Sequence, residues 1–84
     1  MTTINQPVTV AAYYFTGSEL RSFPRAIEHS GRTITFQNGL RYLVRRGQQA
    51  IKLFDMASDD GHTYRLRQDG QAWTLLGLRA GEGR

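Results

Sequence analysis

Runs of alternating apolar and polar residues occupy most of the chain between residues 8 and 78. Alternation with a period of two is typical of a β-strand that buries one face and exposes the other. β-Branched and aromatic residues, which favour strands, are common in these runs. The runs that predict strands are 8–16, 32–36, 40–45, 62–67 and 72–78.

The alternation also assigns a face to each side chain. We expect the apolar members of each run to point into a common interior, and the arginines between them to point toward solvent. The predicted inward set is Ile34, Phe36, Leu40, Tyr42, Val44, Tyr64, Leu66, Trp73 and Leu75, and the predicted outward set is Arg41, Arg45, Arg65 and Arg67.

Pairs of residues that end in glycine separate these runs. Asn-Gly and Asp-Gly place a residue at positive φ at little cost, which tight hairpin turns need. The predicted turns are Ser30-Gly31, Asn38-Gly39, Arg46-Gly47, Asp60-Gly61 and Asp69-Gly70. The regular spacing of the first three glycines fits strands of about five residues joined by short turns. The pattern therefore predicts a β-meander.

Two stretches depart from simple alternation. Between residues 50 and 56 the apolar positions change phase, which predicts a β-bulge near Leu53-Phe54. Residues 24–29 fit either a strand, with Pro24 at its edge or start, or a short helix capped by Ser22. We favour the strand, because Gly31 then closes a hairpin into the next run.

Together these elements predict an all-β fold: a small antiparallel meander of six or seven short strands, arranged as a rolled sheet or an SH3-like barrel. Rolling the sheet would protect its edges from pairing with other chains. The 84 residues have room for a single domain. We expect an ordered core at residues 7–79 and flexible tails at 1–6 and 80–84.

Three segments carry a family resemblance. Residues Pro24–Arg32 run from a proline through an apolar position to a closing Gly-Arg, and the stretches 8–17 and 64–75 look like its flanks. Together they resemble small bacterial β-domains of unknown function. The resemblance implies a small β-barrel or rolled sheet and implies no activity. His29 stands where the family pattern has an aromatic residue.

Composition narrows the classes of function. The chain has no cysteine, which excludes disulfides, thiolate metal sites and thiol nucleophiles. The start of the chain lacks the basic and long apolar regions of a signal peptide, and no run approaches a membrane span. We therefore expect a cytoplasmic protein that does not bind membranes.

Candidate catalytic chemistry is sparse. His29 and His62 are the two histidines, and both lie beside predicted turns rather than in a cluster of metal ligands. No phosphate-binding or dinucleotide-binding glycine motif is present, and no nucleophile elbow surrounds any serine. We predict that the chain is not an enzyme and holds neither a metal nor a cofactor.

Nucleic-acid binding is one remaining class. The formal net charge is +4, and arginine, whose planar fork suits phosphate and carboxylate, supplies most of the basic residues. A GC-rich coding sequence would give the same bias. Small barrels bind single strands with a basic stripe and exposed aromatic rings. The candidate anion or nucleic-acid contacts are Arg32, Arg41, Arg45, Lys52, Arg65 and Arg67, and the candidate stacking residues are Tyr13 and Phe15.

Protein binding is the other class. An exposed strand edge or an outward apolar patch can bind a partner protein. The candidate partner contacts are Leu43, Leu76 and Leu78, which would otherwise complete a two-sided core. We favour a protein-interaction or structural module that binds another protein, with a basic single-strand nucleic-acid-binding β-barrel as the alternative.

Overall fold

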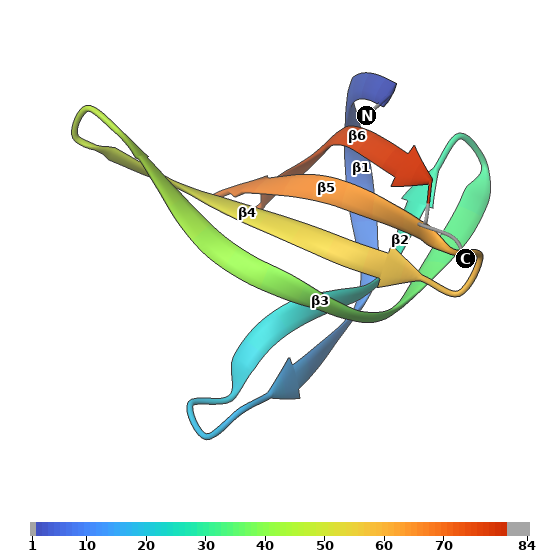
Figure 1. Cartoon of the computed structure of the whole chain (residues 1–84), viewed down its shortest axis with the longest axis horizontal. Coiled ribbons are helices and arrows are strands. Elements are labelled where there is room, and N and C mark those ends of the chain that lie inside the picture. The colour runs from blue at the N-terminus through green and yellow to red at the C-terminus, as the bar shows by residue number, and fades with distance from the viewer. Residues whose placement is uncertain (1, 81–84) are drawn as a thin grey trace.

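The computed structural model describes residues 2–80, which form six antiparallel strands joined by short turns (Figure 1). Each strand pairs with the next along the chain, and the first also pairs with the last, so the sheet closes into a ring. The strands are β1 (Thr2–Thr16), β2 (Arg21–His29), β3 (Arg32–Arg46), β4 (Gln49–Ser58), β5 (His62–Asp69) and β6 (Ala72–Ala80). The predicted all-β meander is confirmed, with six strands.

The first and last strands extend into the segments predicted as tails. β1 begins at Thr2, inside the segment predicted as a flexible tail, because its first residues pair with β6. β6 ends at Ala80, and the remainder of the predicted C-terminal tail, like Met1, lies outside the described residues. Residues 24–29 belong to β2, so the strand rather than the helix is confirmed there.

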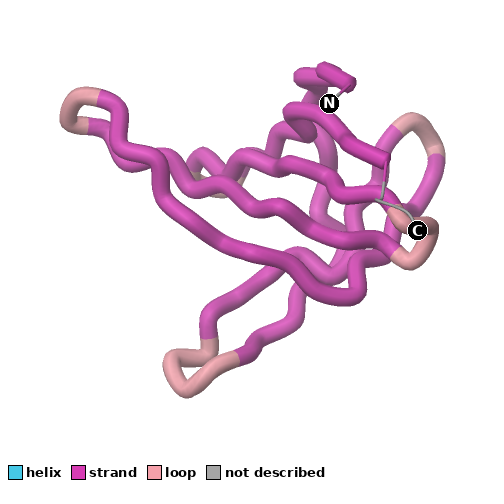
Figure 2. Tube along the Cα trace, viewed as in Figure 1, coloured by secondary structure: helices cyan, strands magenta, loops and turns pink. Residues whose placement is uncertain are grey.

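β1 and β3 are long strands that each change partner part-way along. β1 pairs with β6 up to Val8 and with β2 from Thr9 onward. β3 pairs with β2 up to Thr35 and with β4 from Phe36 onward. As a consequence the β1–β2 and β3–β4 hairpins diverge at their turns (Figures 1 and 2), and the ring is not a regular barrel.

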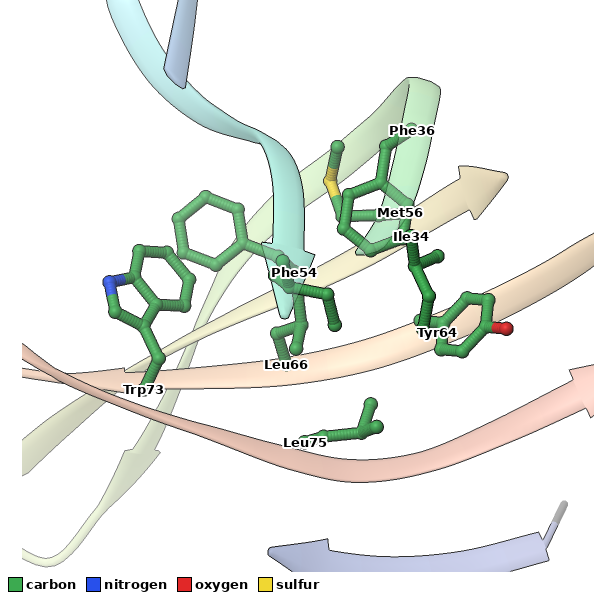
Figure 3. Close-up of a cluster of buried hydrophobic side chains, with 9 residues drawn as sticks. Ile34, Phe36, Phe54, Met56, Tyr64, Leu66, Trp73 and Leu75 are labelled. Atoms are coloured by element: carbon green, nitrogen blue, oxygen red, sulfur yellow. The ribbon is translucent and has the colours of Figure 1, made fainter. Parts of the chain in front are cut away.

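The core lies inside this ring. Strands β2 to β6 contribute its nine buried side chains, most of them shown in Figure 3, and β1 adds half-buried residues around them. Phe54 is central, with its ring centroid 5.0 Å from Trp73 and 6.0 Å from Phe23. The inward positions that are confirmed as buried are Ile34, Phe36, Tyr64, Leu66, Trp73 and Leu75.

A β-bulge in β3 overturns the faces predicted for run 40–45. Phe36 pairs with Ser58 and Asn38 pairs with Ala57, so Gln37 is an extra residue. The extra residue reverses which positions face the core, since side chains alternate along a strand. The predictions that are wrong are the inward faces of Leu40, Tyr42 and Val44 and the outward faces of Arg41 and Arg45.

The bulge predicted in the following strand is also wrong. Pairing runs without a register shift past Leu53 and Phe54 on both sides of β4. The apolar residues change phase there because β4 has apolar side chains on both faces. Phe54 and Met56 point into the core, whereas Ile51 and Leu53 lie on the outer face, half-buried.

Gly39 lies within β3 and not at a turn, so the turn predicted at Asn38-Gly39 is wrong. A Cβ at this position would lie 2.7 Å from the Asp55 carbonyl oxygen and would also clash with Met56 Sδ. Glycine is needed here because the two strands approach closely beside the bulge. The other four predicted turns do connect consecutive strands.

Candidate functional site

β2 and β3 pair along only part of their length and then separate, and we call this separation the fork. The two strands pair only from Ala26–Thr35 to His29–Arg32, and they separate beyond the first of these pairs. Arg25 lies at the point of separation, where its Nη1 donates a hydrogen bond to the Phe36 carbonyl oxygen at 3.3 Å. Within residues 2–80, the facing edges of β2 at 21–25 and of β3 at 38–46 pair with no other strand.

A cleft of about 650 Å³ occupies this fork, between the β1–β2 and β3–β4 hairpins. Three of its apolar side chains are largely exposed: Phe15 at 64%, Leu20 at 68% and Leu43 at 61%. Phe15 and Leu20 come from one hairpin and Leu43 from the other. The cleft is lined by Phe15, Glu19, Leu20, Arg21, Ser22, Arg41, Tyr42, Leu43 and Lys52.

Leu20 reaches the cleft from an unusual backbone conformation. Its φ is +52°, in the left-handed region that large side chains seldom occupy. Its amide donates a hydrogen bond to the Gly17 carbonyl oxygen at 3.0 Å, which closes the turn between β1 and β2. The turn therefore holds a large apolar side chain in solvent at the mouth of the cleft.

The cleft is also cationic. Among the described residues, no carboxylate lies within 4.0 Å of the Arg41 or Lys52 cationic groups, whereas Arg21 forms an ion pair with Glu19 at 2.9 Å. The Arg41 guanidinium lies 5.9 Å from the centre of the Phe54 ring, at the inner end of the cleft. Arg41 takes this place because the bulge at Gln37 moves it to the core-facing side of β3.

The six predicted basic contacts do not form one stripe. Arg41 and Lys52 line the cleft, and Arg45 follows on the same face of β3, opposite Ala50. Arg65 and Arg67 lie on the other face of the sheet. Arg32 lies beside the β2–β3 turn, away from the cleft.

Arg65 has a structural partner. Its Nε and Nη2 donate to the two carboxylate oxygens of Asp55 at 2.8 and 3.0 Å, and the Tyr42 hydroxyl donates to the same carboxylate. Burial, and next the Asp55 charge, raise the pKa of the Tyr42 hydroxyl, so it stays protonated and can donate. The Arg65 guanidinium is therefore already paired with a carboxylate of its own chain.

We expect Asp55→Ala to lower the free energy of unfolding by about 1–2 kcal/mol, because Arg65 and Tyr42 both lose their acceptor and the site is only partly exposed. Urea unfolding followed by circular dichroism measures the change. Asp69→Ala is the matched control, since its ion pair with Arg67 is longer, at 3.7 Å, and Asp69 is exposed. Equal losses in the two variants would contradict a structural role for the Asp55 network.

Some of the predicted stacking and partner residues line the cleft, and the others lie elsewhere. Phe15 and Leu43 line the cleft, whereas the Tyr13 hydroxyl lies 3.1 Å from Trp73 Nε1 and accepts its hydrogen bond. Leu78 packs against the core and Leu76 is half-buried in β6. Leu20 is not among the predicted site residues, although it is a single apolar residue in the polar segment between two predicted strands, which is a signal for an exposed contact.

A serine, an aspartate and a histidine meet at the β4–β5 turn. Ser58 and the His62 amide both donate to the Asp60 carboxylate, and the Ser58 bond comes first among the causes that lower the Asp60 pKa to about 2. His62 Nδ1 lies 3.0 Å from Asp60, so the carboxylate stands between the other two groups. A nucleophilic serine needs the imidazole in that middle position. The order of the three groups therefore differs from that of a catalytic triad and is that of a tight polar turn.

Two further features bear on ligands and membranes. Residues 2–80 contain no cluster of three or more histidine, aspartate or glutamate side chains that could hold a metal ion. In the same stretch, no helix is both long and apolar enough to cross a bilayer.

No family model, curated protein or solved structure matches this chain. The resemblance to small bacterial β-domains therefore stays a prediction.

Proposed function

We propose that this chain is a non-catalytic protein-interaction module, and that it binds its partner in the cleft between the β1–β2 and β3–β4 hairpins. One observation carries the proposal. Three large apolar side chains, each more than 60% exposed, meet at one cleft from two hairpins that no strand of residues 2–80 joins along the fork. Clustered exposure of this kind is typical of surfaces that bury against a partner.

The composition of the cleft favours a protein over a nucleic acid. Leu20 and Leu43 offer aliphatic surface, which protein side chains can pack against and on which bases do not stack. Of the two rings that line the cleft in the described part of the chain, Phe15 is mostly exposed, whereas Tyr42 is half-buried and hydrogen-bonded to Asp55. Single-strand binders generally combine a basic groove with several stacking rings.

Nucleic-acid binding is the second candidate, and the proximity of Phe15, Arg41 and Lys52 favours it. The two candidates respond differently to salt. Binding that depends on phosphate contacts weakens steeply between about 50 and 200 mM salt, whereas burial of apolar surface does not.

The test uses two leucines on opposite faces of β3. Leu43 faces the cleft and Leu40 the outer side, and both are highly exposed, at 61% and 69%. We expect Leu43→Asp to reduce the amount of partner protein captured from host lysate by at least tenfold, and Leu40→Asp to leave it unchanged. Captured protein should persist after nuclease treatment. Equal effects of the two substitutions, or capture that nuclease abolishes, would contradict the proposal.

A further inference from the structure

The cleft exposes the edge of a strand. From Asn38 to Arg46, β3 pairs with β4 on one side, and on the other side no strand of residues 2–80 pairs with it. The backbone amides and carbonyls of such an edge can accept an additional strand. The hydrogen bond from Arg25 to the Phe36 carbonyl oxygen links β2 and β3 where they separate, so the free edge of β3 begins next to this contact.

The side chains on this edge have a regular order. Arg41, Leu43 and Arg45 occupy alternate positions of β3 and therefore share one face, which is the face of the cleft. Lys52 pairs directly with Leu43 from β4 and adds a further cation. Along the edge this face of β3 therefore presents two cleft side chains, a cation and an apolar residue, and then a second cation, Arg45, beyond the cleft lining.

We infer that the cleft accepts an extended segment of a partner protein, which pairs with the free edge of β3. This segment carries an apolar residue with one carboxylate residue two positions before it and another two positions after it. The inference rests on the proposed function, since it identifies the chemistry of the same partner. Residues directly opposite in paired strands share a face, so the two carboxylates would face Arg41 and Arg45 and the apolar residue would face Leu43.

Charge argues against two other occupants. A second copy that paired β3 with β3 would bring arginines against arginines, which is destabilising in a sheet. A single-stranded nucleic acid would place phosphates along the whole edge, whereas the Leu43 side chain, beside Lys52, offers only aliphatic surface. The alternating order fits an acidic and apolar polypeptide better than a uniform polyanion.

The experiment uses fluorescein-labelled peptides with the core Glu-Thr-Leu-Thr-Glu and measures binding by anisotropy. The comparison peptide has the same composition with the core Glu-Leu-Thr-Thr-Glu, which moves the leucine to the opposite face. We expect the first peptide to bind at least tenfold more tightly. A third peptide, with the first core methylated at the alternate backbone amides that would pair with β3, should lose binding.

Matched variants of the protein test the contacts. We expect the Arg41→Glu/Arg45→Glu variant to bind the acidic peptide at least tenfold more weakly, and to bind the corresponding Lys-Thr-Leu-Thr-Lys peptide more tightly than the unaltered chain does. Arg32→Glu, which changes charge beside the β2–β3 turn away from the cleft, should have no effect on either peptide. Exchange of charge preference cannot result from unfolding, which would abolish binding of both peptides.

The outcomes separate this inference from the proposed function. If both acidic peptides bind equally, or neither binds with a Kd below about 1 mM, while Leu43→Asp still prevents partner capture, the inference is overturned and the interaction module stands. If a poly-thymidine oligonucleotide binds and the Arg41→Glu/Arg45→Glu variant loses that binding, both are overturned. A dimer in solution that Leu43→Asp dissociates would overturn the acidic partner in favour of a second copy.

Discussion

Phe54→Ala is expected to lower the free energy of unfolding by about 3–5 kcal/mol, the range for removing a buried aromatic ring from a packed core. Phe54 is 1% exposed, and its ring touches Trp73 and Phe23 from two other strands. The substitution leaves a cavity where β2, β4 and β6 meet. Because a small domain is stabilised by only about 5–15 kcal/mol in total, this substitution should remove a large fraction of the stability.

Urea unfolding followed by circular dichroism measures this change, and Trp73 fluorescence gives a second signal from the same cluster. Phe15→Ala is the matched control, since it removes the same ring from a position that is 64% exposed. That variant should stay within about 0.5 kcal/mol of the unaltered chain. If the two substitutions cost the same, Phe54 is not the centre of the core.

The strands and the buried positions were predictable where alternation ran without interruption. Tyr64 and Leu66 were placed correctly because their strand has regular pairing with β4, and a period of two then fixes every face. Trp73 and Leu75 were placed correctly because the irregular position in β6, next to Leu75, comes after both of them.

The faces of Leu40 and Arg41 could not be predicted from local pattern. The face to which each of them points depends on one extra residue, Gln37. Because Gln37 is an exposed polar residue in a polar stretch, the hydrophobic pattern does not reveal it. Asn38-Gly39 added to the error, because the pair is a common turn signal and here serves a close strand contact. A single bulge therefore reverses the face of every side chain that follows it in β3.

The candidate site was predictable only in part for the same reason. Arg41, Lys52, Phe15 and Leu43 are all predicted contacts, but for two different functions and on three different strands. Their meeting in one cleft follows from the point at which β2 and β3 stop pairing, and alternation within each strand does not fix that point. The pairing of Arg65 with Asp55 was not predictable from the sequence, because Asp55 lies on the neighbouring strand.

A second large loss of stability is expected at Gly39, which lies beside the bulge. Gly39→Ala is expected to lower the free energy of unfolding by about 1–3 kcal/mol, since overpacked positions force neighbouring atoms to move. The new Cβ would lie 2.7 Å from the Asp55 carbonyl oxygen, which cannot move without disturbing the β3–β4 pairing. Asn38→Ala, at the exposed neighbouring position, is the control and should change stability by less than about 0.5 kcal/mol.

A double substitution separates the two contacts of the Gly39 site. Met56→Ala removes the flexible side chain that a Cβ at residue 39 would meet and leaves the Asp55 carbonyl in place. We expect Gly39→Ala combined with Met56→Ala to cost less than the sum of the two single substitutions, by about 0.5–3 kcal/mol, because one clash is relieved. Additive costs would show that the Met56 side chain is not a source of the strain. A neutral Gly39→Ala would mean that β3 and β4 do not approach closely at the bulge, and the faces assigned to Arg41 and Leu43 would then be wrong.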